Sequence, residues 1–298
     1  MSEVRGGEAI RRVAGKIRKF KGRDFVLWNI ASLLNRSWPH DFHYTDSRGL
    51  RFTLDLNDAS YRALYLFGQY EWDLFWTLEN LLDEGDTFLE AGTSIGVYTA
   101  IASRKVGPSG KVIGFEPLNS VRDTATRQLA ANGLTNVTIA PYALGTNPGT
   151  AEIFAFSGLP NTHASLSNLA PAGVGQVCEV TTVDSFLGDD KGTIGLIKLD
   201  VEGSELPALK GARETMLAAH PRAIIEANPE TAAAFGYSFR DLQVWFDDLA
   251  YDGFIWESGR WRRVDSNFEN TRSRNVLFVW RSDDAALRRI RSHAVDDQ

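Results

Sequence analysis

The chain has 298 residues, 43% of them hydrophobic, and its 8 Trp, 8 Tyr and 17 Phe exclude an extensively disordered protein. A formal net charge of −6 at pH 7 excludes a protein that holds nucleic acid through an overall positive field, although a local basic patch stays open. The single cysteine, Cys178, excludes an internal disulfide, and no apolar run approaches the roughly 20 residues of a membrane span, so we expect a soluble, cytoplasmic protein.

Residues 1–60 are predicted to form an extension ahead of a main domain at residues 61–298. Within it, Val13, Ile17 and Phe20 recur at helical spacing among many basic residues, which indicates an amphipathic helix with a basic face. Such a helix either packs on the core with its charges in solvent, which we favour, or contacts a membrane surface or a partner protein.

Two further elements precede the main sheet. Residues 42–56 alternate between apolar and polar side chains on either side of a turn at 46–49, which predicts an antiparallel hairpin. Residues 61–82 carry large apolar side chains three and four positions apart and end at the acidic turn 83–86. This spacing predicts one continuous helix.

Beyond this turn, short apolar runs alternate with helical segments, which is typical of a parallel sheet with crossover helices. We expect seven strands, at residues 87–89, 111–115, 137–140, 194–199, 223–226, 254–256 and 276–280. We expect helices at residues 97–105, 120–132, 205–219, 239–251 and 285–291. The predicted fold is therefore α/β and Rossmann-like, with a mostly parallel seven-stranded sheet and helices on both faces.

The segment 147–182 interrupts this alternation, because it is rich in Gly, Pro, Ser and Asn. Its ends, 151–156 and 177–182, have the composition of strands, so we expect two strands joined by a long loop. A loop of this length either closes over a binding site or is a plain surface excursion, and the sequence leaves both open.

The first strand of the predicted sheet ends in Glu90 and leads through Gly92 and Gly96 into a helix. These glycines allow the close backbone approach that a ligand at the carboxyl end of a strand needs. A dinucleotide-binding loop would have another glycine between them, and a carboxylate would repel the pyrophosphate. The carboxylate of Glu90 instead suits a cationic α-amino group, such as that of S-adenosylmethionine.

The second strand ends in Glu116, about two dozen residues after Gly92, and Pro117 follows it. An acid at this place can accept hydrogen bonds from two ribose hydroxyls, although a surface glutamate that caps the next helix also fits. After the third strand, Tyr142 and Ala143 stand where a base bound beside that ribose would lie. Tyr142 either stacks on the base or packs in the core.

The fourth strand, 194–199, continues into a run of acids that includes Asp200, Glu202 and Glu205. A buried strand that ends in such residues puts ionisable groups at the ligand-binding edge of the sheet. Lys198 and Asp200 could form a pair that tunes a catalytic base, and we prefer the Asp200 region as its source. Glu202 or Glu205 could instead only stabilise the start of the next helix.

Another carboxylate, Glu226, follows the fifth strand, and His163 lies in the irregular segment. Two or three acids at one edge could hold Mg²⁺, but no histidine ligand stands nearby in the sequence, so we predict no metal site. His163 is a further candidate for the base that deprotonates a substrate, although a lone histidine in a loop is more often solvated.

Three segments resemble the FkbM-type S-adenosylmethionine-dependent methyltransferases: Phe-Leu-Glu-Ala-Gly-Thr-Ser-Ile-Gly at 88–96, Val-Ile-Gly-Phe-Glu-Pro at 112–117 and Ile-Lys-Leu-Asp-Val-Glu-Gly at 197–203. The resemblance extends from about residue 68 to residue 280. It implies a seven-stranded class I methyltransferase fold, S-adenosylmethionine as methyl donor, and O-methylation of a hydroxyl on a sugar or natural product.

The family's cofactor loop, Asp-x-Gly-Ala-Asn-x-Gly, corresponds in this chain to Glu90, Gly92, Thr93, Ser94 and Gly96. Glu stands where the family has Asp, and Thr-Ser stands where it has Ala-Asn. The longer glutamate reaches about one methylene further, so the methionine end of the donor would be held slightly differently. Both changes keep a carboxylate and a hydrogen-bonding side chain.

By the same resemblance, Glu116 would bind the ribose, and the family's Lys-Ile-Asp-Val-Glu-Gly segment falls on residues 198–203. Glu71, in the stretch Gly68-Gln69-Tyr70-Glu71, would approach the cofactor, which is a weaker match. The resemblance does not specify the acceptor.

We therefore expect a methyltransferase that aligns donor and acceptor for an in-line displacement, with Asp200, Glu202 or His163 as general base. Two other functions fit the sequence: a nicotinamide-dependent oxidoreductase on a similar sheet, which the missing glycine disfavours, and a non-catalytic cofactor-binding protein. The expected partner is a small-molecule or glycan acceptor, with no nucleic acid, and association into a homo-oligomer stays open.

Overall fold

The structure is a computed structural model that describes Gly7, Arg11 and residues 26–30, 38–155, 164–166 and 175–293. The chain divides into two compact units, residues 1–75 and residues 76–298, and each is described by itself. The predicted basic helix near the N-terminus lies largely outside the described residues. The division of the chain into an extension at 1–60 and a main domain stays a prediction.

The first unit contains the predicted hairpin. Strands β1 (Phe42–Thr45) and β2 (Arg51–Leu54) pair antiparallel. Asp46 closes the turn between them, because its Oδ1 accepts the backbone N–H groups of Arg48 at 2.8 Å and Leu50 at 2.9 Å. Turns of this kind depend on residues close in sequence, which is why the sequence pattern predicts the hairpin correctly.

The single helix predicted for residues 61–82 is wrong, because two helices occupy this stretch. They are α3 (Ala59–Phe67) and α4 (Trp72–Leu81). Helix α3 ends at Gly68, which takes a left-handed φ of 79° and donates its N–H to the carbonyl oxygen of Leu64 at 2.9 Å. The apolar spacing continues across this break, so periodicity alone does not reveal it.

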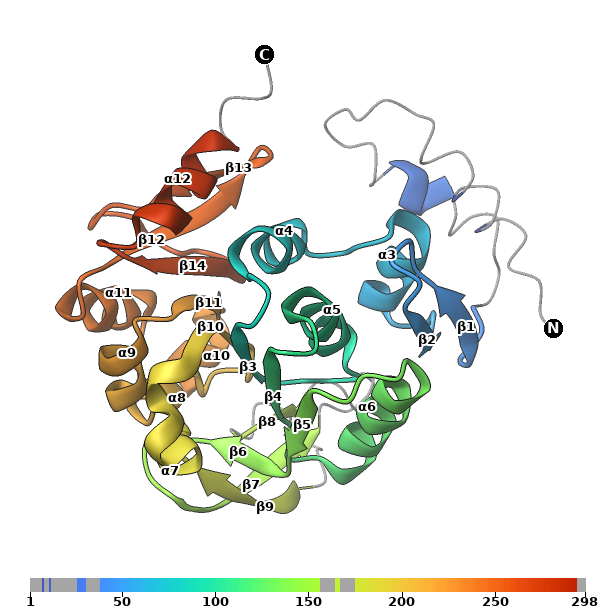
Figure 1. The fold of residues 1–298 in the computed structure, drawn as a ribbon, viewed down its shortest axis with the longest axis horizontal. Coiled ribbons are helices and arrows are strands. Elements are labelled where there is room, and N and C mark those ends of the chain that lie inside the picture. The colour runs from blue at the N-terminus through green and yellow to red at the C-terminus, as the bar shows by residue number, and fades with distance from the viewer. Residues whose placement is uncertain are drawn as a thin grey trace. The chain divides into compact units, whose positions relative to one another are not determined.

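The second unit is built on an eight-stranded sheet with the order β13-β12-β14-β11-β10-β3-β4-β5 (Figure 1). Its strands are β3 (Thr87–Ala91), β4 (Lys111–Phe115), β5 (Val137–Ala140), β10 (Ile194–Leu199), β11 (Arg222–Ala227), β12 (Tyr251–Glu257), β13 (Arg260–Arg263) and β14 (Arg274–Trp280). The neighbours from β11 to β5 run parallel, whereas the pairs that contain β12, β13 or β14 are antiparallel. The predicted α/β fold class is confirmed, with eight strands in place of seven.

The strand that the prediction missed, β13, forms a hairpin with β12 at one edge of the sheet. Ser258 and Gly259 connect the two strands with φ values of 52° and 83°. Positive φ at both central residues is typical of a type I′ turn, whose twist matches that of paired strands. Only Trp261 is buried in β13, so this strand has too few apolar positions to show a pattern.

Helices cover both faces of this sheet (Figure 1). On one face lie α5 (Val97–Val106) and α6 (Asn119–Ala131), and on the other lie α8 (Glu205–Lys210), α9 (Arg213–Ala219) and α11 (Phe239–Asp248). The remaining helical elements are α7 (Val183–Leu187), the 3₁₀ helix η1 (Gly188–Thr193), α10 (Pro229–Ala234) and α12 (Asp284–Ser292). Of these, α7, η1 and α10 were not predicted.

The continuous helix predicted for residues 205–219 is also wrong, because the chain divides there into α8 and α9. Gly211 and Ala212 separate the two helices. A Cβ atom at Gly211 would lie 2.2 Å from the carbonyl oxygen of Gly145, so the close approach of another segment requires glycine at this point. A tertiary contact of this kind leaves no mark on the helical pattern of the sequence.

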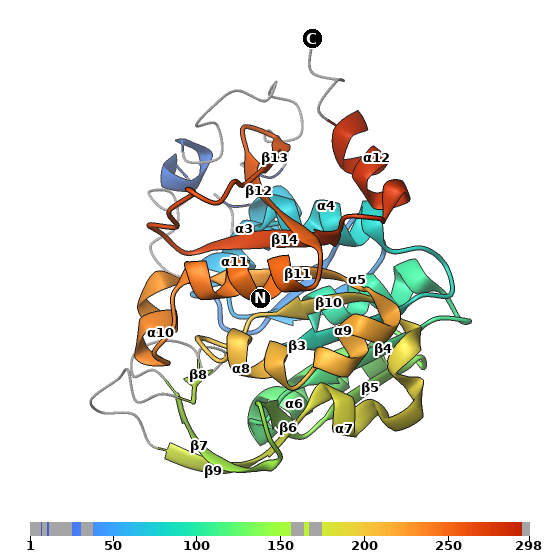
Figure 2. The same ribbon diagram turned by 90° about the vertical axis from the view of Figure 1, so that its left-hand side faces the viewer.

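A smaller sheet with the order β6-β9-β7-β8 accompanies the main sheet (Figures 1 and 2). Its strands are β6 (Tyr142–Leu144), β7 (Gly149–Ala155), β8 (Ala164–Ser165) and β9 (Gly175–Thr181). The two strands predicted around the irregular segment correspond to β7 and β9, which pair antiparallel. The short strands β6 and β8 were not predicted.

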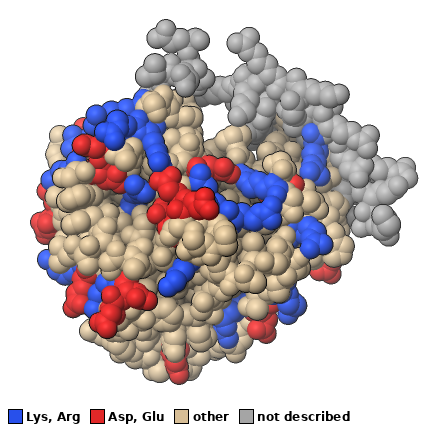
Figure 3. Space-filling view, in the orientation of Figure 1, with Lys and Arg blue, Asp and Glu red and all other residues tan. Residues whose placement is uncertain are grey.

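Charged side chains of both signs are interspersed on the face of the molecule seen in Figure 3. Ion pairs among the described residues include Arg222 with Asp283 at 2.7 Å and Arg289 with Asp83 at 3.0 Å. This face therefore presents no single-sign field of the kind that attracts polyanions. Among the helices of the described residues, none is both long and apolar enough to cross a membrane.

Replacing Phe278 with alanine is expected to lower the free energy of unfolding by about 3–5 kcal/mol, because its ring is buried and stacks on Phe246 with centroids 3.7 Å apart. Urea titration followed by circular dichroism measures this change. Val177→Ala is the control, since that side chain is 71% exposed and its loss should change the free energy by less than about 0.5 kcal/mol. Equal effects of the two substitutions would contradict the packing described here.

Candidate functional site

Four parallel strands bring the predicted site residues to one edge of the main sheet. In the register of the sheet, Glu90 of β3 lies opposite Lys198 of β10, and Leu199 of β10 lies opposite Ile225 of β11. The residues that follow these strands therefore emerge next to one another. Helices α8 and α10, which follow β10 and β11, lie toward the left-hand side of Figure 2 and mark this carboxyl edge.

The loop after β3 is held against the end of β10. Gly92 has a φ of 80°, and a Cβ atom there would lie only 1.9 Å from the carbonyl oxygen of Asp200. The N–H of Asp200 in turn donates to the carbonyl oxygen of Ala91 at 3.1 Å. The close approach of the Asp200 backbone therefore already requires glycine at position 92, whether or not a ligand is bound.

Glu90 lies under this loop and is 1% exposed. Its Oε2 accepts a hydrogen bond from the hydroxyl of Thr99 at 2.5 Å, and its Oε1 lies 3.4 Å from the ammonium nitrogen of Lys198. Burial raises the pKa of Glu90, although the positive charge of Lys198 acts in the opposite direction. Burial thus favours the protonated form of this carboxyl group, whereas a positive charge beside it favours the ionised form.

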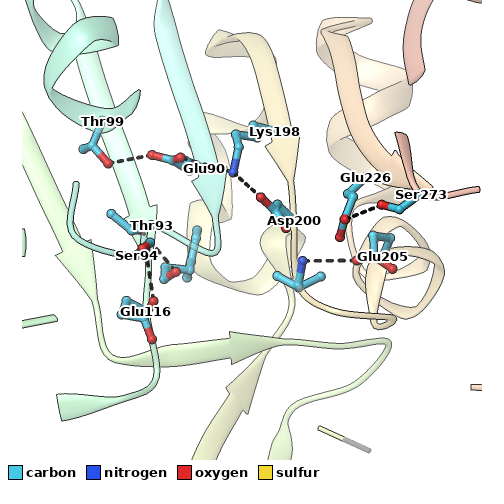
Figure 4. A network of polar contacts seen from close by, with 12 residues as sticks. Glu90, Thr93, Ser94, Thr99, Glu116, Lys198, Asp200, Glu205, Glu226 and Ser273 are labelled. Carbon is cyan, nitrogen blue, oxygen red and sulfur yellow. Dashed lines mark hydrogen bonds and ion pairs between the residues drawn. The ribbon is translucent and has the colours of Figure 1, made fainter. Parts of the chain in front are cut away.

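Lys198 lies between two carboxyl groups (Figure 4). Besides Glu90, it contacts Asp200, to whose Oδ2 it donates a hydrogen bond at 3.1 Å. Lys198 is 3% exposed, whereas Asp200 is half-buried. The predicted pair of Lys198 and Asp200 is thus present, and the ammonium group also reaches the acid of the cofactor loop.

Glu116 ends β4 on the other side of the loop (Figure 4). Its Oε2 accepts the backbone N–H of Ser94 at 3.2 Å, and its Oε1 accepts that of Leu118 at 3.1 Å. Burial raises the pKa of Glu116 to about 7. The side chain of Glu116 thus connects the cofactor loop to the start of α6 and does not lie on the surface. Pro117, the next residue, is half-buried.

The two predicted adenine-binding residues differ in how far they are buried. Ala143 is buried, and Tyr142 is half-buried on β6. The ring of Tyr142 lies edge-on to Phe186 at a centroid distance of 6.3 Å, and Phe186 packs on Phe115 at 4.8 Å. Tyr142 thus belongs to an aromatic cluster with Phe186 and with Phe115, the last residue of β4. The stacking of Tyr142 on a base stays a prediction.

Glu205 organises the loop that contains Asp200, which is a role that the sequence interpretation missed. It is 1% exposed, and its Oε1 accepts the backbone N–H groups of Val201 and Gly203, both at 3.1 Å. Its Oε2 accepts the hydroxyl of Tyr237 at 2.8 Å. Burial raises the pKa of Glu205 to about 7. Only its position just after the Asp-Val-Glu-Gly segment could have indicated this role.

Glu226 is a further acid at this edge, next to the Asp200 loop. Its Oε1 accepts the hydroxyl of Ser273 at 2.8 Å. Burial, and then the negative charges of Asp200 and Glu202, raise the pKa of Glu226 well above its ordinary value. In the part of the chain that the structure describes, no group of three His, Cys, Asp or Glu side chains is arranged to hold a metal ion.

The contributions of two further predicted site residues stay predictions. His163 lies outside the described residues. Glu71 belongs to the first unit, where its carbonyl oxygen accepts the N–H of Phe75 at 3.0 Å near the start of α4. Their contributions to catalysis and to cofactor binding stay predictions.

The Glu205→Gln variant tests the protonation of this buried acid. The pKa of Glu205 is about 7 in the folded state and has the ordinary value of 4.5 in the unfolded state, so the folded protein binds this proton more tightly. The resulting stabilisation of the folded protein is complete below about pH 4.5 and is lost as the pH rises through 7. Glutamine can accept the two backbone N–H groups through its Oε1 and donate from its Nε2 to the hydroxyl oxygen of Tyr237, but it does not titrate. The stability of the variant relative to the wild type should therefore increase by up to ~3 kcal/mol between pH 5 and pH 8.

Urea unfolding of both proteins at the two pH values measures this difference. Glu230→Gln is the control, because Glu230 is exposed on α10 and its replacement should leave the pH dependence of the wild type unchanged. Parallel pH dependence of Glu205→Gln and the wild type would mean that Glu205 is ionised in the folded protein.

Comparisons with known proteins assign these motifs to a family. Residues 90–252 match the methyltransferase FkbM domain. Methyltransferase sdnD of Sordaria araneosa is 29% identical over 42% of this chain and 60% of that protein. The catalytic subunit TRM61 of a tRNA (adenine(58)-N(1))-methyltransferase of Cryptococcus neoformans is 45% identical, over 18% of this chain and 12% of that protein. The chain therefore spans less than two thirds of the length of these curated relatives.

Two solved structures are similar at low identity. Methyltransferase FkbM from Methylobacillus flagellatus has a TM-score of 0.46 and 16% identity, over 92% of this chain and 58% of that chain. A SAM-dependent methyltransferase from Aquifex aeolicus has a TM-score of 0.41 and 18% identity, over 75% of this chain and 94% of that chain. The family rests on the domain match, which covers more than half of the 298 residues and contains Glu90, Glu116 and Asp200. The chain therefore belongs to the FkbM-type S-adenosylmethionine-dependent methyltransferase family.

Proposed function

We propose that this chain O-methylates a hydroxyl group of a sugar or natural product, with S-adenosylmethionine as the methyl donor. One observation supports the proposal above the others: the buried carboxyl group of Glu116 accepts the N–H of Ser94, in the middle of the loop that begins at Glu90. Glu90 would bind the amino group of the donor, and Glu116 would bind its ribose. One loop thus connects these two acids. Asp200 stands beside that loop, on the neighbouring strand.

The residues at this edge fit the chemistry of the donor. Glu90 Oε1 is buried and accepts no hydrogen bond from the described residues, so it can accept one from a cationic amino group. Each carboxyl oxygen of Glu116 accepts one backbone N–H, which leaves lone pairs for two ribose hydroxyls. When it is bound, S-adenosylmethionine supplies an electrophilic methyl group on a positively charged sulfur.

Asp200 is our candidate for the general base that removes the proton of the acceptor hydroxyl. Its Oδ2 accepts a hydrogen bond from the ammonium group of Lys198 at 3.1 Å, which orients the carboxyl group, and its half-buried position leaves this group open to an acceptor. Lys198 itself is held between two carboxyl groups, so it orients the base and does not exchange the proton. Glu202, half-buried at the same loop with a φ of 51°, is the second candidate.

The two alternative functions receive less support. A nicotinamide-dependent oxidoreductase would need a glycine where Thr93 and Ser94 stand, and the match to a methyltransferase domain disfavours it. A non-catalytic cofactor-binding protein has the same donor site and differs only in the absence of methyl transfer. The small-molecule or glycan nature of the acceptor, the cytoplasmic location and any homo-oligomer stay predictions.

Glu116→Ala is expected to weaken the binding of S-adenosylhomocysteine by about 10- to 100-fold, because two hydrogen bonds between a carboxylate and hydroxyl groups are lost. Isothermal titration calorimetry measures the dissociation constant, and Glu230→Gln serves as the control on an exposed acid. If the wild-type protein does not bind this ligand, or if Glu116→Ala binds it equally well, the proposed donor site is wrong.

Asp200→Asn is expected to lower kcat by roughly a hundredfold or more and to change the dissociation constant of S-adenosylhomocysteine by less than about threefold. A screen with S-adenosylmethionine labelled at the methyl group identifies an acceptor, and the same label then gives the rates. Asp248→Asn, on the exposed side of α11, is the matched control and should retain the wild-type rate.

The chemical stability of the labelled product tests the O-methyl assignment. A methyl ether survives mild alkaline hydrolysis, whereas a methyl ester releases methanol. Release of the label, or its location on nitrogen by mass spectrometry, would contradict transfer to a hydroxyl group.

A further inference from the structure

One carboxyl group at the edge of the main sheet has no part in the proposed donor site or in the assignment of the base. Glu226 stands near the end of β11, next to β10 on one side and β14 on the other. On the β14 side, Glu226 lies opposite Asn275. On the β10 side, Ile225 lies opposite Leu199, and Glu226 is the next residue of β11. This places it level with the first residue after β10, which is Asp200.

The contacts of Glu226 are incomplete. Its Oε1 accepts a hydrogen bond from Ser273 at 2.8 Å, which fixes the orientation of the carboxyl group. Its Oε2 is buried and has no hydrogen-bond partner among the described residues. Leaving a buried polar atom without a partner is unfavourable, so this oxygen is a candidate for a hydrogen bond to a bound molecule. Figure 4 shows the carboxyl group between Asp200 and Ser273.

A second polar side chain at the end of β11 has the same feature. Asn270 donates a hydrogen bond from its Nδ2 to the carbonyl oxygen of Ala227 at 2.7 Å, so its amide is fixed at the end of β11. Its Oδ1 is buried and has no partner in the described part of the chain. Two oxygen atoms of fixed side chains thus lack partners at one strand end, and both can accept a hydrogen bond.

The charges around Glu226 restrict the kind of group that these atoms can bind. Asp200 and Glu202 act on Glu226 with negative charge. Two cations on the strands that adjoin β11 form ion pairs with other acids: Lys198 with Asp200 at 3.1 Å, and Arg274 with Glu257 on β12 at 3.6 Å. A phosphate or carboxylate on a ligand would be repelled here and would have no donor hydrogen to offer.

A hydroxyl group is the partner that suits this carboxyl in either protonation state. It donates a hydrogen bond to Oε2 when the carboxyl is ionised and accepts one when Oε2 carries the proton. Burial and the neighbouring acids favour the protonated form of Glu226, and an ammonium group could not accept a hydrogen bond from that form. Hydroxyl recognition therefore fits better than recognition of an amine.

We infer that Glu226, oriented by Ser273, binds a hydroxyl group of an uncharged methyl acceptor through Oε2 and excludes anionic acceptors from the site. This inference rests on the proposed methyl transfer, because it takes the edge beside Asp200 as the acceptor side. It makes Glu226 a specificity-determining residue, distinct from the base Asp200 and from the donor acids Glu90 and Glu116.

Two sugars that differ only at carbon 6, where one has a hydroxymethyl group and the other a carboxylate, test the inference. Methyl β-D-glucopyranoside is neutral, and the corresponding methyl glucuronide carries a carboxylate at carbon 6. Each is titrated, with ligand-observed NMR, into the full-length protein saturated with S-adenosylhomocysteine. The wild type is expected to bind the neutral glucoside at least about tenfold more tightly than the glucuronide.

Variants at position 226 separate recognition from folding. Glu226→Ala should weaken binding of the glucoside about tenfold, whereas Glu226→Gln, whose amide both donates and accepts, should stay within about threefold of the wild type. Both variants should bind S-adenosylhomocysteine as the wild type does, which shows that they are folded. Glu230→Gln, at an exposed acid of α10, is the matched control for the loss of a carboxylate.

The outcomes distinguish this inference from the proposed function. Absence of S-adenosylhomocysteine binding in the wild type would contradict the methyltransferase proposal. Normal binding of that ligand would leave the proposal intact and overturn the inference about Glu226 in any of three cases: neither sugar binds, both bind equally well, or Glu226→Ala binds the glucoside like the wild type.

Discussion

A single buried ammonium group joins the two motifs of the site. Lys198 on β10 lies 3.4 Å from Glu90 on β3 and 3.1 Å from Asp200, and it is 3% exposed. Without it, two carboxylates would meet at a strand junction that is largely removed from water, where an uncompensated charge costs several kcal/mol. Because burial still raises the pKa of Glu90 despite this neighbour, the balance of charge there is close, and a second cation at Glu90 would shift it toward the ionised form.

The same junction imposes a backbone constraint that ties the motifs together. A Cβ atom at Gly92 would lie 1.9 Å from the carbonyl oxygen of Asp200, and one at Gly114 of β4 would lie 2.7 Å from Oγ1 of Thr93. The cofactor loop therefore fits between the ends of β10 and β4 only when both positions are glycine. Part of the sequence motif that predicts donor binding thus has a packing origin, and the donor-binding residues proper are the side chains that this packing orients.

The sequence predicts the parallel core of the fold well because each of those strands is a compact apolar run between helices. The bounds of β4, β5 and β10 agree with the prediction residue for residue. The breaks at Gly68 and Gly211 were missed, because the first interrupts a continuous apolar spacing and the second depends on contact with Gly145. The sequence likewise leaves open whether Glu205 only stabilises the start of a helix, because its hydrogen bond to Tyr237 joins residues 32 positions apart and leaves no local pattern.

The environments of the acids at this edge differ in a way that local sequence cannot show. Burial raises the pKa of Glu116, Glu205 and Glu226, whereas Asp200 lies 3.1 Å from an ammonium group. An acid that keeps its proton is suited to hydrogen bonding with a neutral group, and one that is ionised is suited to accepting a proton. The side chains themselves are nearly the same, but Asp200 contacts the ammonium group of Lys198, whereas Glu226 faces the negative charges of Asp200 and Glu202. The assignment of the base to Asp200 and of hydroxyl recognition to Glu226 follows from this difference in neighbouring charge.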